Sequence, residues 1–572
     1  MTVTAILIVI TLICGFYVAW NIGANDVANA MGTSVGSGAL TLTTAVILAA
    51  IFEFAGAYIV GANVSETVRK KLFDPGKIVE RVDLDTPANL KLKSINHLVE
   101  HGAEVKSGDA LFELVAENGV TKRFKSPVDG HFSMTPLESV GDESEIDLTK
   151  INHAYSVELN RIEAPFILAC GMIASLLAAG TWLLIATWMT WPVSTTHSIV
   201  GAVVGFGVVA LGVDGVDWDK VGLISAGWVV SPLISGAIAY FLFGFVLRSV
   251  FHKRDPVRAA ISLTPKLTFL VIVVLSGVTT YKGLKPLWKN WGYDPFDPSF
   301  VGIVALITVG IGAIAMLVSQ QILKRFKPID DPTNPIIDAE VSRSLHKAEM
   351  HLQRVRNAAD GDIKEEADKL LATLGQVTQK ARDQVVTNTD SPALRQVEKI
   401  FVYLQVITAC LVAFAHGSND VANAIGPLSA AYQALESGAI SAKASTPSWA
   451  LFLGGAGIVI GLATWGWRVI QTVGKRITEL TPSRGFCAEF AAAITILLAS
   501  TLPIGLPIST THTLVGAVLG VGLARGLNAL NLKTMRDIVA GWAITIPAGA
   551  GLSVLFFIIL KAIFIDSGWA TA

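Results

Sequence analysis

The chain has 572 residues, of which 52% are hydrophobic and only 16% are charged. Soluble globular proteins carry about 25% charged residues, so a chain with this composition and a mean hydropathy of +0.56 is predicted to lie mostly in lipid. The 44 basic and 45 acidic residues nearly cancel, which argues against a nucleic-acid partner.

Apolar runs of about 20 residues indicate membrane-spanning helices. In chain order they lie near 3–37, 41–64, 163–189, 193–213, 219–247, 267–283, 299–323, 397–432, 448–472, 486–503, 506–524 and 537–563. We therefore predict an all-α integral membrane protein with about twelve transmembrane or re-entrant helices.

Four of these runs are unusual. The long runs at 3–37 and 397–432 contain Gly, Asn and Asp, so we expect each to be a broken helix with an unwound segment. The runs at 193–213 and 506–524 are short and open with Pro and Ser or Thr, so each is either re-entrant or spanning.

Basic residues gather in three short loops, near 248–258, 475–484 and 525–536. Because basic loops usually remain in the cytoplasm, about twelve passes would leave both termini outside the cell (inner or plasma) membrane. The basic residues at 69–71 then lie outside, in a long segment that charge governs only weakly. No basic residue precedes the first apolar run, so we expect that run to stay in the mature protein.

Residues 65–160 form a polar stretch between the membrane segments 1–64 and 161–323, on the predicted outer side. Gly-Asp and Pro-x-x-Gly turns between short apolar runs predict a small β-rich insertion. The pattern resembles the biotinyl or lipoyl barrel-sandwich fold, with its halves in an unusual order. No lysine occupies a Met-Lys-Met-like hairpin tip, so we expect no covalent cofactor. A β-rich loop without a defined role is the alternative.

Residues 324–396 are predicted to lie in the cytoplasm. Apolar residues recur there at spacings of three and four on both sides of an Asp-Gly-Asp turn at 360–362, which predicts an amphipathic helical hairpin. We interpret this hairpin as a linker to the second membrane part, residues 397–572.

Two motifs occur twice in the same order. GANDVANAMG at 23–32 is echoed by GSNDVANAIG at 417–426, and PVSTTH at 192–197 by PISTTH at 507–512. The first copy begins outside, whereas the second follows the cytoplasmic hairpin, so the two membrane parts are predicted to be inverted repeats. Secondary transporters use this architecture for alternating access, with the binding site near the midplane.

Asp26 and Asp420 lie inside apolar runs, where a carboxylate costs about 3 kcal/mol and normally faces a cavity with a partner. No basic residue lies deep in a predicted pass except Arg468, which sits near an inner end, so we expect neither carboxylate to have a protein cation as partner. Hard oxygen ligands around a negative charge suit a small hard cation. The alternative is that these residues cap broken helices. The amides beside the aspartates are Asn25, Asn29, Asn419 and Asn423.

Each Ser-Thr-Thr triplet follows a proline and opens an apolar helix, so hydroxyls and free N–H groups gather at a positive helix end. Two such ends from inverted repeats could bind one anion. The alternative is ordinary N-capping, which we expect of one residue in each triplet. The six hydroxyl-bearing residues are Ser194, Thr195, Thr196, Ser509, Thr510 and Thr511.

Five further residues are candidates for supporting roles. His197 and His512 follow the triplets and are expected to orient them, while His416 has no histidine counterpart in the first repeat. Glu53 and Glu489 are mid-run acids that could accept a proton from an oxyanion, bind another cation or join helices.

Cation sites beside an anion site, without buried Lys or Arg, favour symport, because each ion improves the binding of the other. Two alternatives come from other classes. An intramembrane hydrolase could use Ser, His and Asp, although a duplicated motif is not needed for one catalytic centre. A passive anion channel would need the same anion site but no coupling ion.

The two decapeptides and the two Pro-x-Ser-Thr-Thr-His segments resemble the signatures of the inorganic phosphate transporter (PiT) family. The resemblance implies phosphate as substrate, cation symport, twelve passes and outward termini, in a protein that is not an enzyme. It assigns Asn25, Asp26, Asn419 and Asp420 to cations and the six triplet residues to phosphate. It also marks Glu53, His416 and Glu489 as functionally sensitive. The Asn-Asp pairs look more like sodium-coupled than proton-coupled members, and the sequence leaves a homodimer open.

Overall fold

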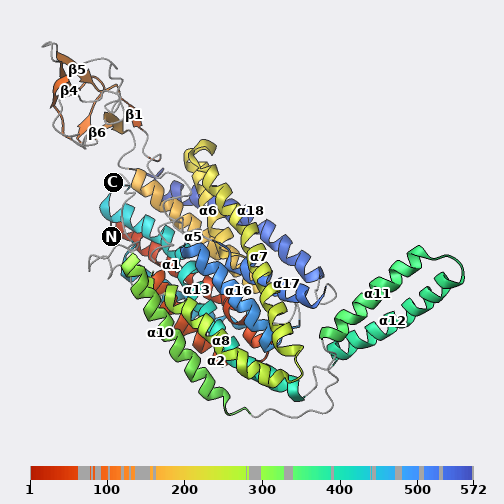
Figure 1. Ribbon diagram of the computed structural model, residues 1–572. Helices are drawn as coiled ribbons and strands as arrows, with labels where there is room; N and C mark the ends of the chain where they lie inside the picture. Colours follow the sequence, from red (N-terminus) through yellow and green to blue (C-terminus); the bar gives the residue numbers. More distant parts are fainter. Residues whose placement is uncertain are drawn as a thin grey trace.

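The computed structural model describes residues 2–61, 78, 81–83, 92–100, 103–116, 121–127, 130–134, 155–158, 163–278, 280–281, 298–326, 339–387, 392–438, 440, 446–470, 479–501, 508–526 and 532–569. Long helices form one bundle (Figure 1). The strands lie beyond one end of this bundle, near both termini, and a two-helix hairpin projects from the opposite end.

The helices of the bundle coincide with the predicted apolar runs. They are α1 (Val3–Gly36), α2 (Leu42–Val60), α5 (Ala164–Trp188), α6 (Thr195–Leu211), α7 (Trp218–Val246), α8 (Pro256–Val278), α10 (Pro298–Leu323), α13 (Pro392–Ser437), α14 (Ser448–Thr464), α16 (Pro482–Thr501), α17 (Thr510–Arg525) and α18 (Leu532–Phe564). Among the helices that the structure describes, nine are long and apolar enough to cross a membrane. An all-α integral membrane protein is thus confirmed, while the number of passes stays a prediction.

The two longest helices are continuous, contrary to the prediction that their Gly- and Asn-rich segments unwind. Residues 23–32 lie inside α1 and residues 417–426 inside α13. The glycines instead allow close helix packing. A Cβ on Gly23 would lie 1.9 Å from the Ile458 carbonyl oxygen, and one on Gly417 would lie 2.1 Å from the Glu53 carbonyl oxygen. Small residues at such crossings let helix backbones approach in the bilayer.

The two membrane parts exchange packing partners. Helix α2 packs on α13, and α14 packs on α1. In the same way α7 packs on α17, and α18 packs on α6. Gly516 of α17 lies against the carbonyl of Pro232, and Gly201 of α6 lies against the carbonyl of Ile546. Because each part covers the helices of the other, the two copies of each sequence motif are brought to the centre of the bundle.

The insertion contains two small antiparallel sheets, with strand orders β1-β7-β6-β3 and β2-β4-β5. Their aromatic core includes Phe112, which stacks on Phe124 at a centroid distance of 5.0 Å and lies 6.2 Å from Phe132. The strands are β1 (Arg81–Asp83), β2 (Leu92–His97), β3 (Glu104–Val105), β4 (Ala110–Ala116), β5 (Thr121–Lys125), β6 (Gly130–Met134) and β7 (Tyr155–Glu158). The resemblance of the insertion to the barrel-sandwich fold and the side of the membrane on which it lies remain predictions.

The hairpin consists of α11 (Ala339–Ala358) and α12 (Asp362–Thr387), which pack on each other. Gly361 makes the turn with φ +66°, a left-handed conformation that glycine adopts without strain. Arg356 Nε lies 2.7 Å from Asp368 Oδ1 across the turn. The hairpin lies at the end of the bundle opposite the two termini (Figure 1), a position that suits a linker.

Candidate functional site

The Ser-Thr-Thr triplets stand at the N-termini of α6 and α17. Ser194 is the N-cap of α6 and accepts a hydrogen bond from the backbone N–H of His197 at 3.3 Å. Ser509 caps α17 in the same way, with the backbone N–H of His512 at 3.2 Å. One residue in each triplet is therefore an N-cap, as predicted, and both helix ends are buried in the bundle.

The middle threonine of each triplet binds the aspartate of its own repeat. The Thr195 hydroxyl donates to Asp26 Oδ2, and the Thr510 hydroxyl donates to Asp420 Oδ2 at 2.8 Å. All four side chains are buried. The structure thus joins each acidic motif to a triplet that lies far from it in the sequence.

The last threonine of each triplet connects the two repeats. The Thr196 hydroxyl donates to the Ile508 carbonyl at 3.3 Å, and the Thr511 hydroxyl donates to the Val193 carbonyl at 3.2 Å. Asparagines extend this reciprocal pattern, since Asn423 donates to Thr196 at 3.3 Å and Asn29 donates to Thr511 at 2.8 Å. The two triplets therefore face each other across the centre of the bundle, and their third residues form the seam between them.

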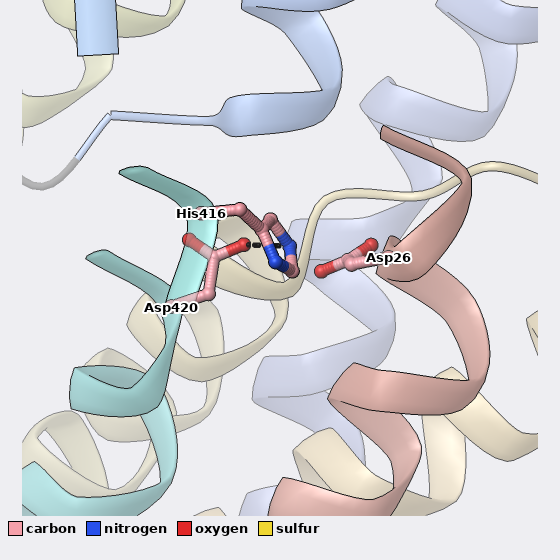
Figure 2. A group of neighbouring side chains, drawn as sticks. All are labelled: Asp26, His416 and Asp420. Atoms are coloured by element: carbon pink, nitrogen blue, oxygen red, sulfur yellow. Dashed lines mark ion pairs between the residues drawn. The ribbon is translucent and has the colours of Figure 1, made fainter. Parts of the chain in front are cut away.

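Asp26, His416 and Asp420 come together at this centre. Figure 2 shows His416 beside Asp420, with Asp26 facing them from α1. One ligand atom from each of the three residues lies within 4.8 Å of the others. His416 Nε2 is 2.8 Å from Asp420 Oδ2. Asp420 thus has an imidazole as partner, which is a cation only when protonated, so the prediction that neither carboxylate has a protein cation as partner stays a prediction. The sequence signal for this contact was present, because residues four apart meet on a helix face.

The two acidic motifs differ in the oxygens that they leave open. Asn419 donates its amide to Asp420 Oδ1 at 2.7 Å and to the Ile508 carbonyl at 3.2 Å. Asn25 instead points its amide at Thr187 Oγ1 (2.9 Å). Within the described part of the chain, the buried Oδ1 atoms of Asn25 and Asp26 have no hydrogen-bond partner. Unpartnered oxygens of this kind are suitable ligands for a small hard cation.

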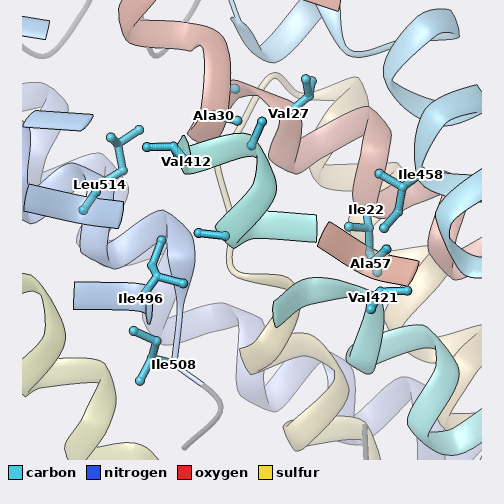
Figure 3. Close-up of a cluster of buried hydrophobic side chains, with 14 of the residues drawn as sticks. Ile22, Val27, Ala30, Ala57, Val412, Val421, Ile458, Ile496, Ile508 and Leu514 are labelled. Atoms are coloured by element: carbon cyan, nitrogen blue, oxygen red, sulfur yellow. The ribbon is translucent and has the colours of Figure 1, made fainter. Parts of the chain in front are cut away.

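Glu53 of α2 marks a second asymmetry. Its Oε1 lies 3.2 Å from His416 Nδ1, so the imidazole has a carboxylate on each side. The equivalent helix crossing in the other repeat brings Gly23 against Ile458, as Gly417 lies against Glu53. Ile22 and Ile458 belong to a buried apolar cluster there (Figure 3). Among the described residues of these two crossings, the Glu53–His416 contact occurs at the α13 crossing alone.

The sequence shows Glu489 of α16 as a single acid in an apolar run, whereas the structure surrounds its carboxylate with hydrogen-bond donors. Its carboxylate accepts hydrogen bonds from four side chains on two other helices. Their distances are 2.6 Å for Thr33, 2.6 Å for Ser34, 3.2 Å for Gln405 and 2.7 Å for Thr408. Sequence reasoning missed these partners, because none of the four residues lies in a repeated motif. The arrangement joins α1, α13 and α16 beside the centre.

The family model described as the phosphate transporter family matches residues 22–98 and 146–553. The chain belongs to this family. The transporter is 38% identical over 564 residues to a Chlamydia pneumoniae protein that carries the name phosphate permease, covering 98% of this chain and 99% of that protein. It is 36% identical over 556 residues to inorganic phosphate transporter 2-1, chloroplastic, of Arabidopsis thaliana, covering 97% of this chain and 72% of that protein.

A solved structure titled the sodium-dependent phosphate transporter is also similar to the transporter. It has a TM-score of 0.64 and 30% identity, covering 97% of this chain and 99% of that chain. These matches confirm the resemblance to phosphate transporters and show a permease rather than an enzyme. The hydrolase alternative fails on geometry as well, since Ser194 Oγ bonds to the backbone of His197 and not to its imidazole.

Proposed function

We propose that this transporter imports inorganic phosphate together with sodium ions by alternating access about the buried centre. One observation carries the cation part. The Oδ1 atoms of Asn25 and Asp26 are buried and without hydrogen-bond partners among the described residues. Unpartnered buried oxygens are costly unless a cation or water satisfies them. The first sodium ion is therefore proposed to bind there, and a second beside Asn419 and Asp420.

Phosphate is proposed to bind between the N-termini of α6 and α17. No lysine or arginine occurs among the buried side chains of the described residues, so its charge must be balanced by helix ends, sodium and His416. Helix geometry leaves the first N–H groups of each helix outside the helical ladder, directed at the site. Each N-cap serine accepts one hydrogen bond and keeps its own hydroxyl hydrogen for a phosphate oxygen.

The threonine–aspartate bonds suggest how the ions are coupled. Thr195 donates to Asp26 and Thr510 donates to Asp420, so both hydroxyl hydrogens are directed at carboxylates. A sodium ion on a carboxylate would neutralise part of its negative charge, weaken the hydrogen bond from the threonine and free that hydroxyl to donate to phosphate. Sodium binding would then increase phosphate affinity, and the reverse follows by linkage.

The exchange of packing partners supports alternating access. Helices α1, α2, α5, α6 and α7 are proposed to form the first repeat, and α13, α14, α16, α17 and α18 the second. Motions of one repeat against the other would then open the centre to either side in turn. The β-rich insertion and the termini are proposed to face outward and the α11–α12 hairpin the cytoplasm, in the cell membrane.

Proton coupling is a second candidate, and His416 favours it. Its imidazole lies between Glu53 and Asp420 (3.2 and 2.8 Å), a position suited to hold a transported proton. Glu53 and Glu489 are proposed as further cation or proton sites.

The deciding experiment measures labelled phosphate uptake into liposomes that contain the purified transporter, with sodium and proton gradients imposed separately. Accumulation driven by the sodium gradient alone supports the proposal. Accumulation driven only by the proton gradient would replace sodium by protons. Equilibration without accumulation under either gradient would identify a passive channel.

A further inference from the structure

Four aromatic rings form a continuous column directly after the two triplets. Trp228 of α7 contacts His197 of α6, with ring centroids 3.9 Å apart. His197 contacts His512 of α17 at 4.3 Å. His512 in turn stacks on Trp542 of α18 at 3.5 Å, with 23° between the ring planes. Each ring comes from a different helix, and the two histidines in the middle meet between the two membrane parts.

The sequence supplies the two tryptophans at matching places. Each closes an Ala-Gly-Trp tripeptide, at 226–228 in α7 and at 540–542 in α18. Each histidine likewise ends a Ser-Thr-Thr-His segment. The ring column, defined as Trp228, His197, His512 and Trp542, is therefore made of two equivalent ring pairs that meet histidine to histidine.

The column connects two closely packed helix pairs. A Cβ on Gly516 of α17 would lie 2.3 Å from the Pro232 carbonyl oxygen of α7, and one on Gly201 of α6 would lie 2.6 Å from the Ile546 carbonyl oxygen of α18. Such contacts leave little freedom within the α7–α17 pair or the α6–α18 pair. Each pair carries one triplet, so the distance between the triplets depends on how one pair packs against the other.

The column runs across this junction between the pairs. His197 of the α6–α18 pair touches both Trp228 and His512 of the α7–α17 pair. His512 Nδ1 also lies 3.2 Å from the backbone carbonyl of Trp228. We propose that the ring column is a positioning unit that sets the distance between the two triplets and hence the fit of phosphate. The inference rests on the proposed binding of phosphate between α6 and α17.

His197 acts through its ring surface in this unit. Neither of its ring nitrogens has a hydrogen-bond partner among the described residues, although the side chain is 2% exposed. A phenyl ring can therefore replace it, whereas removal of the ring breaks the column in the middle. His512 differs, because a phenyl ring there keeps the stacking on Trp542 but loses the contact with the Trp228 carbonyl.

The test measures KM and Vmax for phosphate in sodium-driven liposome uptake. His197→Ala is expected to raise KM about tenfold, because small shifts of binding groups are costly, while His197→Phe stays within about threefold of the unaltered protein. The double variant His197→Ala/His512→Ala is expected to raise KM no further than the worse single variant, since either change breaks the same column. Phe206→Ala is the matched control. Phe206 joins α6 to Phe557 of α18 at 5.0 Å, away from the triplet, so its loss should reduce the folded amount without changing KM.

Three results would overturn the inference. An unchanged KM in both alanine variants, with sodium-driven uptake intact, would remove the positioning role and leave the proposed function standing. A loss in His197→Phe as large as in His197→Ala would show that the ring nitrogens, and not the ring surface, act on the substrate. Absence of sodium-driven accumulation by the unaltered transporter would overturn the proposed function together with the role of the column.

Discussion

The crossing of α1 and α14 allows a quantitative prediction for Gly23→Ala. The added Cβ would lie 1.9 Å from the Ile458 carbonyl oxygen and 2.8 Å from the Leu462 backbone nitrogen. Both atoms belong to the backbone, so no side chain can rotate away. An ordinary contact of 3.4 Å instead of 1.9 Å requires the two helices to separate by about 1.5 Å.

This separation should affect both stability and transport. Overpacking of this kind costs about 1–3 kcal/mol. Gly23 lies within one turn of Asn25 and Asp26, so the displaced helix carries their oxygens away from the triplets. Since a misplacement of about 1 Å can reduce the rate of a positioned reaction about a hundredfold, we expect uptake to fall at least tenfold.

The assay is sodium-driven phosphate uptake into liposomes, normalised to the amount of monodisperse protein after size-exclusion chromatography. Gly244→Ala in α7 is the matched control, because nothing lies within 4 Å of the Cβ position and alanine favours the helix by about 1 kcal/mol. Gly417→Ala, whose Cβ would lie 2.1 Å from the Glu53 carbonyl oxygen, should match the loss in Gly23→Ala. Normal uptake by Gly23→Ala would refute the reasoning.

Three further predictions concern charge and the insertion. Asp26→Asn and Asp420→Asn should abolish sodium-dependent uptake while leaving a monodisperse protein; normal sodium dependence in either variant would contradict the assignment of cation ligands. Replacing residues 75–155 by a short linker should leave uptake measurable, because the second repeat has no such insertion, and complete loss in a well-folded deletion would show that the insertion is needed. Glu53→Gln should narrow the preference for phosphate over sulfate, measured by sulfate competition. Glu489→Gln should leave this preference unchanged, since the Glu489 carboxylate already accepts four hydrogen bonds. A narrowed preference in Glu489→Gln, with none in Glu53→Gln, would identify Glu489 as the carboxylate that accepts the proton of phosphate.

The sequence by itself determined the class of the protein. Apolar runs long enough to cross a bilayer require helices, because backbone groups in lipid must be satisfied within the segment. The duplicated motifs are long enough to identify the family and to name the residues that meet at the centre. The N-caps at Ser194 and Ser509 were also predictable, because capping depends only on neighbouring residues.

Only the tertiary structure decided which residues pair. The Thr195–Asp26 contact joins positions 169 residues apart, and the Thr511–Val193 bond joins positions 318 apart. Local patterns cannot specify such contacts. The same limit explains why α1 and α13 were expected to unwind. Glycine has the same weak helix propensity in a broken helix and in a tight crossing, and only the close approach of a partner helix distinguishes the two, as at Gly23, where a Cβ would lie 1.9 Å from the Ile458 carbonyl oxygen.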